Sequence, residues 1–302
     1  MSNKLKYAIV LALTTALISG TNNFLTKIAV TAVNDPVVFT FLKNALVAVF
    51  LVGLTALTGR RHELPTLTRR DIIKLMAIGA IGGSLPFILF FTGLALVPAV
   101  TASFIHKTLF IWVTLLAIPF LKERVGKLQF AALALLLGGN LALFGLPRLT
   151  FSAGELMILA ATILWAIENI IAKKALSNLS SSLVAGARMT VGSLIILAVI
   201  AIQGKTSLLA GLSAIQWGWT AVTSLLLCGY VLTWYTALKH APATLVASLL
   251  VPATLVTNAL TAVFVTHALP NQQLLSGTLL AIGMILLISR AHKIFPSPAP
   301  IT

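Results

Sequence analysis

The sequence predicts an all-α membrane protein of ten transmembrane helices, built as two inverted five-helix repeats with both termini in the cytoplasm. Three observations support this prediction. The chain is strongly apolar, its apolar stretches are long enough to cross a bilayer, and its two halves resemble each other at a nearly constant offset. The predicted domains are a first repeat over residues 1–146, a second repeat over 154–290 and a disordered cytoplasmic tail over 291–302.

The composition indicates that lipid, rather than water, covers most of the protein surface. Hydrophobic residues make up 59% of the chain and charged residues only 9%, and the mean hydropathy is +1.04. A soluble domain carries about 25% charged residues. Because one crossing needs roughly 20 helical residues, the apolar stretches predict ten spans, at 7–28, 36–57, 73–95, 99–120, 128–146, 154–175, 182–203, 216–237, 243–264 and 273–290.

The first span also has the features of a signal peptide. Lys4 and Lys6 precede an apolar run, as in the first part of a secretory signal. The run continues past Gly20 without a small-residue cleavage site, and nine further spans follow. We therefore interpret it as a transmembrane helix.

The distribution of basic residues predicts the orientation. Fifteen Lys and Arg residues lie in segments on the same side as the N-terminus, whereas the other side holds only Arg148 and Lys205. Cytoplasmic loops carry such an excess, so we expect a multi-pass protein of the cell inner (cytoplasmic) membrane. The net charge of +15 is thereby explained by topology, and a nucleic-acid partner is not expected.

The two halves of the chain repeat each other. The segment GTNNFLTKIAV at 20–30 resembles AIENIIAKKAL at 166–176, which aligns Asn23 with Asn169, and Lys43 falls level with Arg188. An odd number of spans per repeat forces the second copy to enter the membrane upside down. Inverted repeats recur in secondary transporters, whose substrate site lies near the midplane between the repeats.

Short motifs recur at the same places in both halves. The first half has GLALVPAVTAS at 93–103, PFLKER at 119–124 and a glycine pair at 138–139; the second has YTALKHAP at 235–242, VPA at 251–253 and Gly283. These motifs resemble the EamA repeat of the drug/metabolite transporter superfamily. The resemblance implies a ten-helix secondary transporter with a central cavity, without specifying a substrate. The chain departs from the family pattern at two places. The proline in the middle of the span is kept as Pro252 in the ninth span, but the fourth span has Lys107-Thr108 there. The second repeat has His267 where the first has Glu123.

Several charged side chains lie inside predicted spans, where lipid is a costly environment. Lys107 lies deep in the fourth span, and it either binds an anionic group of the substrate or forms an ion pair with Glu168, the only acid well inside a span. Glu168 resembles in position the membrane-embedded glutamate of small multidrug pumps of the superfamily, which suggests proton coupling; pairing with a lysine is the alternative. Lys43 and Arg188 have gating or cavity roles, unless they extend to the interface.

Polar stripes along the spans complete the predicted substrate site. Such stripes should face neighbouring helices or a wet cavity, although single Ser, Thr and Asn residues also form ordinary hydrogen bonds between helices. Pro86 and Pro252 are expected to kink their spans. The predicted substrate-binding residues are Lys107, His106, Asn22, Asn23, Trp165, Asn169, Tyr230, Trp234 and Asn258.

Other function classes fit the sequence less well. The histidines are scattered, no nucleophile, metal-binding or P-loop motif is present, and the single Cys228 excludes an internal disulfide and a cysteine-based zinc site. We therefore predict no catalytic residues, no metal and no cofactor. Channels generally form their pores by oligomeric symmetry, whereas inverted repeats within one chain are typical of alternating access.

The charges inside the spans suggest the substrate class. The basic residues Lys27, Lys43, Lys107 and Arg188, against one acid, favour an anionic or zwitterionic metabolite such as an amino acid or organic acid, and export is the expected direction. The alternative is a proton-coupled exporter of multidrug cations that uses Glu168. The expected partners are a small-molecule substrate, the lipid bilayer and, in the alternative, protons; the sequence leaves monomer and homodimer open.

Overall fold

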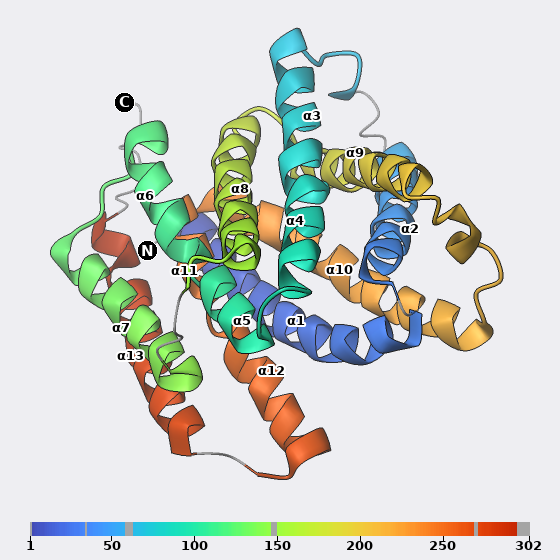
Figure 1. Ribbon diagram of the computed structural model, residues 1–302. Helices are drawn as coiled ribbons and strands as arrows, with labels where there is room; N and C mark the ends of the chain where they lie inside the picture. Colours follow the sequence, from blue (N-terminus) through green and yellow to red (C-terminus); the bar gives the residue numbers. More distant parts are fainter. Residues whose placement is uncertain (1, 34, 58–62, 146–149, 269–270, 295–302) are drawn as a thin grey trace.

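The computed structural model describes residues 2–33, 35–57, 63–145, 150–268 and 271–294. Within these ranges every regular element is a helix (Figure 1), and ten helical segments are long and apolar enough to cross a membrane. These ten segments coincide with the ten predicted spans to within a few residues. The chain is therefore a multi-pass membrane protein.

The first repeat and the second repeat contain the same number of spans. The first is formed by α1 (Asn3–Val33), α2 (Pro36–Leu57), α3 (Arg69–Gly83), α4 (Leu85–Leu94), α5 (Ala99–Lys107), α6 (Leu109–Leu121) and α7 (Lys127–Phe144). The second is formed by α8 (Ala153–Ala175), α9 (Ser181–Ile202), α10 (Ala214–His240), α11 (Ala243–Leu249), α12 (Ala253–Thr261) and α13 (Asn271–Ile294). Helix α13 thus includes the first four residues of the predicted disordered tail, and 295–302 lie outside the described residues.

Three spans are broken near their middle. The third is divided at Ser84, two residues before Pro86, and the ninth is divided just before Ala253, at Pro252, so both expected kinks are confirmed. The fourth is divided at Thr108 without a proline. Thr108 stabilises that break by donating a hydrogen bond from its Oγ1 to the carbonyl of Ile105, at 2.6 Å. The fourth span is therefore broken although it has Lys107-Thr108 where a proline was expected.

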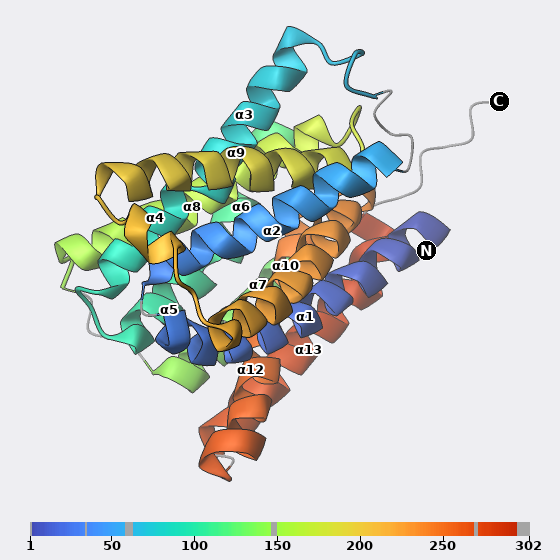
Figure 2. The same ribbon diagram turned by 90° about the vertical axis from the view of Figure 1, so that its right-hand side faces the viewer.

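The helices of one repeat pack against those of the other in matching pairs. Helix α1 packs on α10, and its counterpart α8 packs on α3 and α4; α2 packs on α9, and α7 on α13. Figure 1 shows the α7–α13 pair at one edge of the bundle, and Figure 2 shows α1 beside α10. Each of these contacts has a counterpart when the repeats are exchanged, as expected for two copies of one structural unit.

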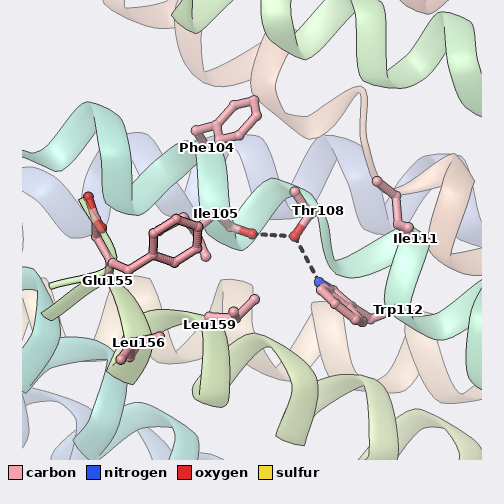
Figure 3. Close-up of a pocket in the computed structure, with 9 residues that line it drawn as sticks. Phe104, Ile105, Thr108, Ile111, Trp112, Glu155, Leu156 and Leu159 are labelled. Atoms are coloured by element: carbon pink, nitrogen blue, oxygen red, sulfur yellow. Dashed lines mark hydrogen bonds between the residues drawn. The ribbon is translucent and has the colours of Figure 1, made fainter. Parts of the chain in front are cut away.

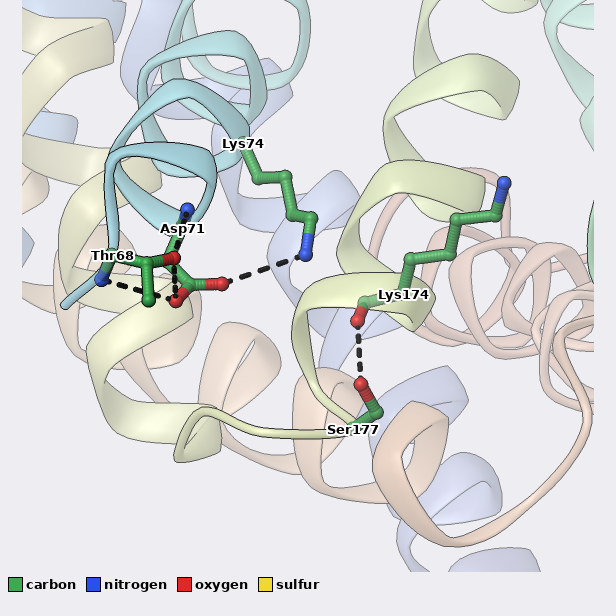
Figure 4. A network of polar contacts seen from close by, with 5 residues as sticks. All are labelled: Thr68, Asp71, Lys74, Lys174 and Ser177. Carbon is green, nitrogen blue, oxygen red and sulfur yellow. Dashed lines mark hydrogen bonds and ion pairs between the residues drawn. The ribbon is translucent and has the colours of Figure 1, made fainter.

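Helix α3 begins where the sequence carries a capping box. The Thr68 side chain accepts a hydrogen bond from the Asp71 backbone at 3.2 Å, and the Asp71 carboxylate accepts one from the Thr68 backbone at 3.3 Å (Figure 4). The Lys74 ammonium lies 3.5 Å from the same carboxylate. In the same view Ser177 donates to the carbonyl of Lys174 just past the end of α8. These local contacts determine where the two helices start and stop.

The α3–α9 contact depends on two facing glycines. A Cβ atom placed on Gly192 would lie 2.7 Å from backbone atoms of Gly83, so the two helices approach as closely as their backbones allow. Small residues permit such close packing in membranes. The same contact brings the broken third span against α9, where Arg188 is located.

Gly192→Ala is expected to destabilise the protein by about 1–3 kcal/mol, because the new methyl group would force the α3 and α9 backbones apart. The matched control is Gly186→Ala on the same helix, where a Cβ would be 3.8 Å from Leu51 Cβ, an ordinary contact. That control should gain about 0.5–1 kcal/mol from helix propensity. Unfolding of both variants in mild detergent measures the difference, and equal stability would contradict this packing.

An ion pair joins two loops on the side of the bundle away from the N-terminus. Asp35 Oδ1 accepts hydrogen bonds from the backbone of Val37 at 2.9 Å and Val38 at 3.0 Å, while Asp35 Oδ2 lies 2.8 Å from Lys205 Nζ. Burial raises the pKa of Asp35, but the Lys205 ammonium and the backbone donors outweigh it, so the pKa lies below its ordinary value of 3.8.

Asp35→Asn should keep the helix cap but lose the ion pair, at a cost of up to about 1 kcal/mol at pH 7 because Lys205 is partly exposed and screened. Since folding lowers the pKa of Asp35, the stabilisation is complete above about pH 4 and is lost as the pH falls through the lowered value. Thermal unfolding of the wild type and the variant at pH 7 and pH 3 tests this. A stability difference that grows on acidification would contradict the assignment.

Candidate functional site

Three side chains from the second repeat form a charged cluster beside the broken third span. Glu168 on α8, Arg188 on α9 and Tyr235 on α10 are all buried. The Tyr235 hydroxyl donates to Glu168 Oε1 at 2.5 Å and accepts from Arg188 Nη1 at 3.3 Å. A phenol can donate and accept at once, so Tyr235 links the carboxylate to the guanidinium.

The break in the third span adds a backbone acceptor to this cluster. In a continuous helix the Gly82 carbonyl would accept from residue 86, but Pro86 has no N–H. The free carbonyl instead accepts from Arg188 Nη2 at 3.0 Å and from Trp165 Nε1 at 3.1 Å. The neighbouring carbonyl of Gly83 accepts from Asn44 Nδ2 at 3.2 Å. The first repeat thereby supplies acceptors for side chains of both repeats.

Trp165 also belongs to an aromatic cluster, which we define as Phe87, Phe90, His106 and Trp165. The ring centroid of Trp165 lies 4.9 Å from that of His106, 5.1 Å from that of Phe87 and 5.8 Å from that of Phe90. His106 Nδ1 is buried, and none of the described residues forms a hydrogen bond with it. The cluster therefore joins α4, α5 and α8, and it offers one unused polar atom among apolar rings.

Lys107 follows His106 at the end of α5 and is half-buried. The structure records no hydrogen bond or ion pair for its ammonium among the described residues. The predicted alternative, an ion pair between Lys107 and Glu168, is not formed, because Glu168 bonds to Tyr235 and is close to Arg188. Lys107 thus remains a cation without a recorded anionic partner.

Lys43 is a second cation of this kind. Its side chain is only 8% exposed, which argues against extension to the membrane interface. The ammonium donates to Thr26 Oγ1 at 3.2 Å and lies 5.2 Å from the centroid of Phe39. Asn22 accepts from the same Thr26 hydroxyl, whereas Asn23 is exposed. Of the two predicted asparagines, only Asn22 therefore joins the surroundings of Lys43.

The remaining predicted site residues are placed differently. Asn169 is buried and donates to the Trp165 carbonyl at 2.9 Å, and its Oδ1 has no hydrogen-bond partner within the described ranges. Tyr230 and Trp234 stack on each other, with centroids 6.0 Å apart. Asn258 is half-buried on α12, and no recorded polar contact links it to the charged cluster in the described part of the chain. The side chain of Lys27 lies outside the described residues.

The bundle is closed on the side where α1 begins, which we call the N-terminal side. The Glu123 carboxylate, between α6 and α7, accepts from the backbone of Ala243 at 2.7 Å and of Thr244 at 3.0 Å, at the start of α11. Thr244 Oγ1 donates to the same carboxylate at 2.7 Å. Helix α11 also packs on α6. No comparable packing joins α5 to α12 on the opposite side in the described residues.

The predicted alignment of Glu123 with His267 needs a correction. Lys122 and His267 both end a span in the left-handed conformation, with φ of 56° and 51°. They are therefore equivalent, and the counterpart of Glu123 is Ala268, which is exposed. The second repeat has no carboxylate at this position, so the closure by Glu123 is found in one repeat only.

A hollow of about 260 Å³ lies between the fourth span and the start of α8 (Figure 3). Its walls are mainly apolar, and Trp112 Nε1 donates to Thr108 Oγ1 at 3.0 Å along one side. Ile105 and Thr108 line it, one on each side of His106 and Lys107 in the sequence. The predicted polar residues do not line this hollow, which therefore differs from the predicted midplane cavity.

Several contributors to the site were not predicted. Phe87 and Phe90 lie in a continuously apolar run, where nothing distinguishes them from lipid-facing residues. The Gly82 carbonyl could have been suspected from the helix-breaking string Gly82-Gly83-Ser84-Leu85-Pro86. Among the described residues, no group of three or more His, Cys, Asp and Glu side chains could hold a metal ion.

A repeated ten-span bundle with buried charges where the repeats meet has the architecture of a membrane transporter. Residues 6–145 and 152–290 each match the EamA-like transporter family. The chain belongs to this family and is an EamA-type transporter of the drug/metabolite transporter superfamily. A search of curated proteins found no match. A solved structure described only as "Crystal structure of protein" is similar in fold, with a TM-score of 0.77 and 16% identity over 94% of this chain and 98% of that one.

Proposed function

We propose that this transporter is a secondary carrier that exports a small anionic or zwitterionic metabolite, such as an amino acid or organic acid, across the cell inner membrane. The observation that carries the proposal is the charge balance inside the spans. Glu168 is the acid of the charged cluster, and the Tyr235 hydroxyl links it to Arg188. Among the described residues, Lys43 and Lys107 have no carboxylate partner, so they can attract an anion into the bundle.

Alternating access between two inverted repeats is part of the proposal. Two observations support one conformer of such a cycle. The N-terminal side is closed, with Glu123 bound to the start of α11, and in the described part of the chain α5 and α12 do not pack closely on the opposite side. The excess of basic residues supports an N-terminal side in the cytoplasm. In the proposed cycle this conformer faces outward, and the broken spans supply the points at which helices bend.

Counterflow in liposomes tests the proposal. The purified protein should exchange an acidic or zwitterionic solute saturably, and Lys107→Ala should lower its affinity about tenfold or more, because a charge-assisted hydrogen bond is lost. Lys107→Arg should keep much of that affinity. Lys127→Ala, which removes an exposed lysine at the start of α7, is the matched control. Unchanged affinity in Lys107→Ala would exclude this lysine from the site, and unsaturable flux would indicate a channel.

A proton-coupled exporter of cations is the second candidate. The observation that favours it is Glu168, a carboxylate only 1% exposed at membrane depth. Its contact with Tyr235 and the neighbouring Arg188 works against it, because a guanidinium repels a cationic substrate. Uptake driven by a pH gradient would be lost in Glu168→Gln if this candidate were correct. Its retention would rule out proton coupling through Glu168.

A further inference from the structure

We propose that Arg188 is a second anion-binding position, which takes the carboxylate of the substrate, and that Glu168 occupies this position while substrate is absent. The inference rests on the proposed function, because it assigns one part of the substrate path. It gives Glu168 the role of an internal substitute for the substrate anion.

The first argument is that the pairing of Arg188 is incomplete. A guanidinium carries five N–H donors in a fork that matches a carboxylate. Arg188 is 7% exposed, yet its recorded hydrogen bonds are one to Tyr235 at 3.3 Å and one to the Gly82 carbonyl at 3.0 Å. Its buried Nε has no hydrogen-bond partner in the part of the chain that the structure describes. The guanidinium therefore has unused capacity for a carboxylate.

The second argument is that Glu168 is a replaceable partner. The two groups make no direct ion pair within 4.0 Å, and the Tyr235 hydroxyl joins them instead. Glu168 fills the space beside Gly82: a Cβ on Gly82 would collide with Glu168 Cγ and would lie 3.3 Å from Arg188 Nε. An anion that displaces the Glu168 side chain would thus meet the unpaired Nε–H.

The third argument is that the position is linked to the aromatic cluster. Trp165 and Arg188 donate to the same carbonyl, that of Gly82. A solute that packs against the indole of Trp165 is therefore close to the guanidinium of Arg188, because both side chains are hydrogen-bonded to the Gly82 carbonyl. Lys107 is next to His106, whose ring contacts Trp165, so an anion first attracted by Lys107 has Arg188 available as a second cation that is linked to the same indole.

Binding of matched acids and amides tests the inference. The melting temperature of the purified protein in mild detergent would be followed with acetate and acetamide, succinate and succinamide, and benzoate and benzamide at constant ionic strength. At least one acid should raise the melting temperature of the wild type while its amide does not. Glu168→Gln should bind that acid about tenfold more tightly, if the Glu168 carboxylate blocks the space beside Arg188 about 90% of the time in the wild type.

Arg188→Gln should abolish the acid-specific shift. This variant leaves the buried Glu168 carboxylate without its neighbouring cation, which destabilises the fold. The double variant Arg188→Gln with Glu168→Gln removes both charges and avoids this effect. It should also lack the acid-specific shift. The inference is overturned if no acid acts differently from its amide in the wild type, if Glu168→Gln binds the acid more weakly, or if the double variant keeps the shift. If Lys107→Ala loses the acid-specific shift while the double variant keeps it, the anion binds at Lys107, and the inference is overturned as well.

Counterflow of the wild type separates this inference from the proposed function. If exchange is saturable but the acid-specific shift survives loss of Arg188, the carrier proposal stands and the inference fails. If the wild type exchanges no solute, the proposed function fails whichever way the acids bind.

Discussion

Arg188→Leu is expected to destabilise the protein by about 3–5 kcal/mol, because it leaves the buried Glu168 carboxylate without the charge beside it. It also removes the donors that Arg188 gives to Tyr235 and to the Gly82 carbonyl. Transport should be lost with it, since the variant removes the hydrogen bond by which α9 holds the Gly82 carbonyl at the break in the third span. The effect should exceed that of substitutions at the surface, which usually change stability by less than about 0.5 kcal/mol.

Unfolding in mild detergent measures this effect, and a second variant isolates its cause. Arg188→Leu combined with Glu168→Gln removes both charges, and it should recover most of the lost stability, since replacing a buried pair costs far less than breaking it. If the double variant is as unstable as Arg188→Leu, packing of the arginine side chain, rather than the unpaired charge, is the cause. Wild-type stability in Arg188→Leu would contradict the structural role of the cluster.

Glu123→Ala is expected to open the N-terminal side of the bundle. The Glu123 carboxylate accepts three hydrogen bonds at the start of α11, and each bond to a charged group contributes about 1.5–3 kcal/mol. Losing even part of this stabilisation should raise the open population about tenfold or more. Glu123→Gln retains one acceptor oxygen, so it should have a smaller effect.

Thiol labelling can measure that opening. Ser248 on α11 is 1% exposed, and a cysteine placed there in a Cys228→Ser background should react slowly with a membrane-impermeant reagent. Adding Glu123→Ala should speed labelling about tenfold, in line with the population change. Unchanged labelling would show that α11 stays on α6 without the carboxylate, and that other contacts close this side.

The ten spans could be predicted because hydropathy depends only on local sequence, and a bilayer requires each crossing to be apolar and about 20 residues long. The kinks at Pro86 and Pro252 were predictable for a similar reason, since proline removes a backbone donor wherever it occurs. The break at Thr108 was not, because a hydroxyl bonded to its own helix leaves no mark in the sequence.

The contacts of the charged cluster could be predicted only in part. Glu168 and Arg188 were recognised as costly residues in lipid, but the sequence offered Lys107 as the partner of Glu168, and the structure shows Tyr235. The predicted substrate-binding residues on the eighth span are Tyr230 and Trp234, which stack on each other, whereas Tyr235 beside them forms the hydrogen bond to Glu168. Neighbouring residues on a helix point about 100° apart, so the rotation of α10 within the bundle decides which one reaches Glu168.

By itself the sequence determined that lipid surrounds this protein, and it determined the ten spans, the two repeated halves and the charged residues that are costly in lipid. Each of these follows from composition or from the spacing of residues along the chain. Only the tertiary structure decided which buried groups meet: Glu168 with Tyr235, Arg188 and Trp165 with the Gly82 carbonyl, and Glu123 with α11. The physical reason is that these partners lie 67 to 120 residues apart in the chain and come together only through packing of helices from different spans.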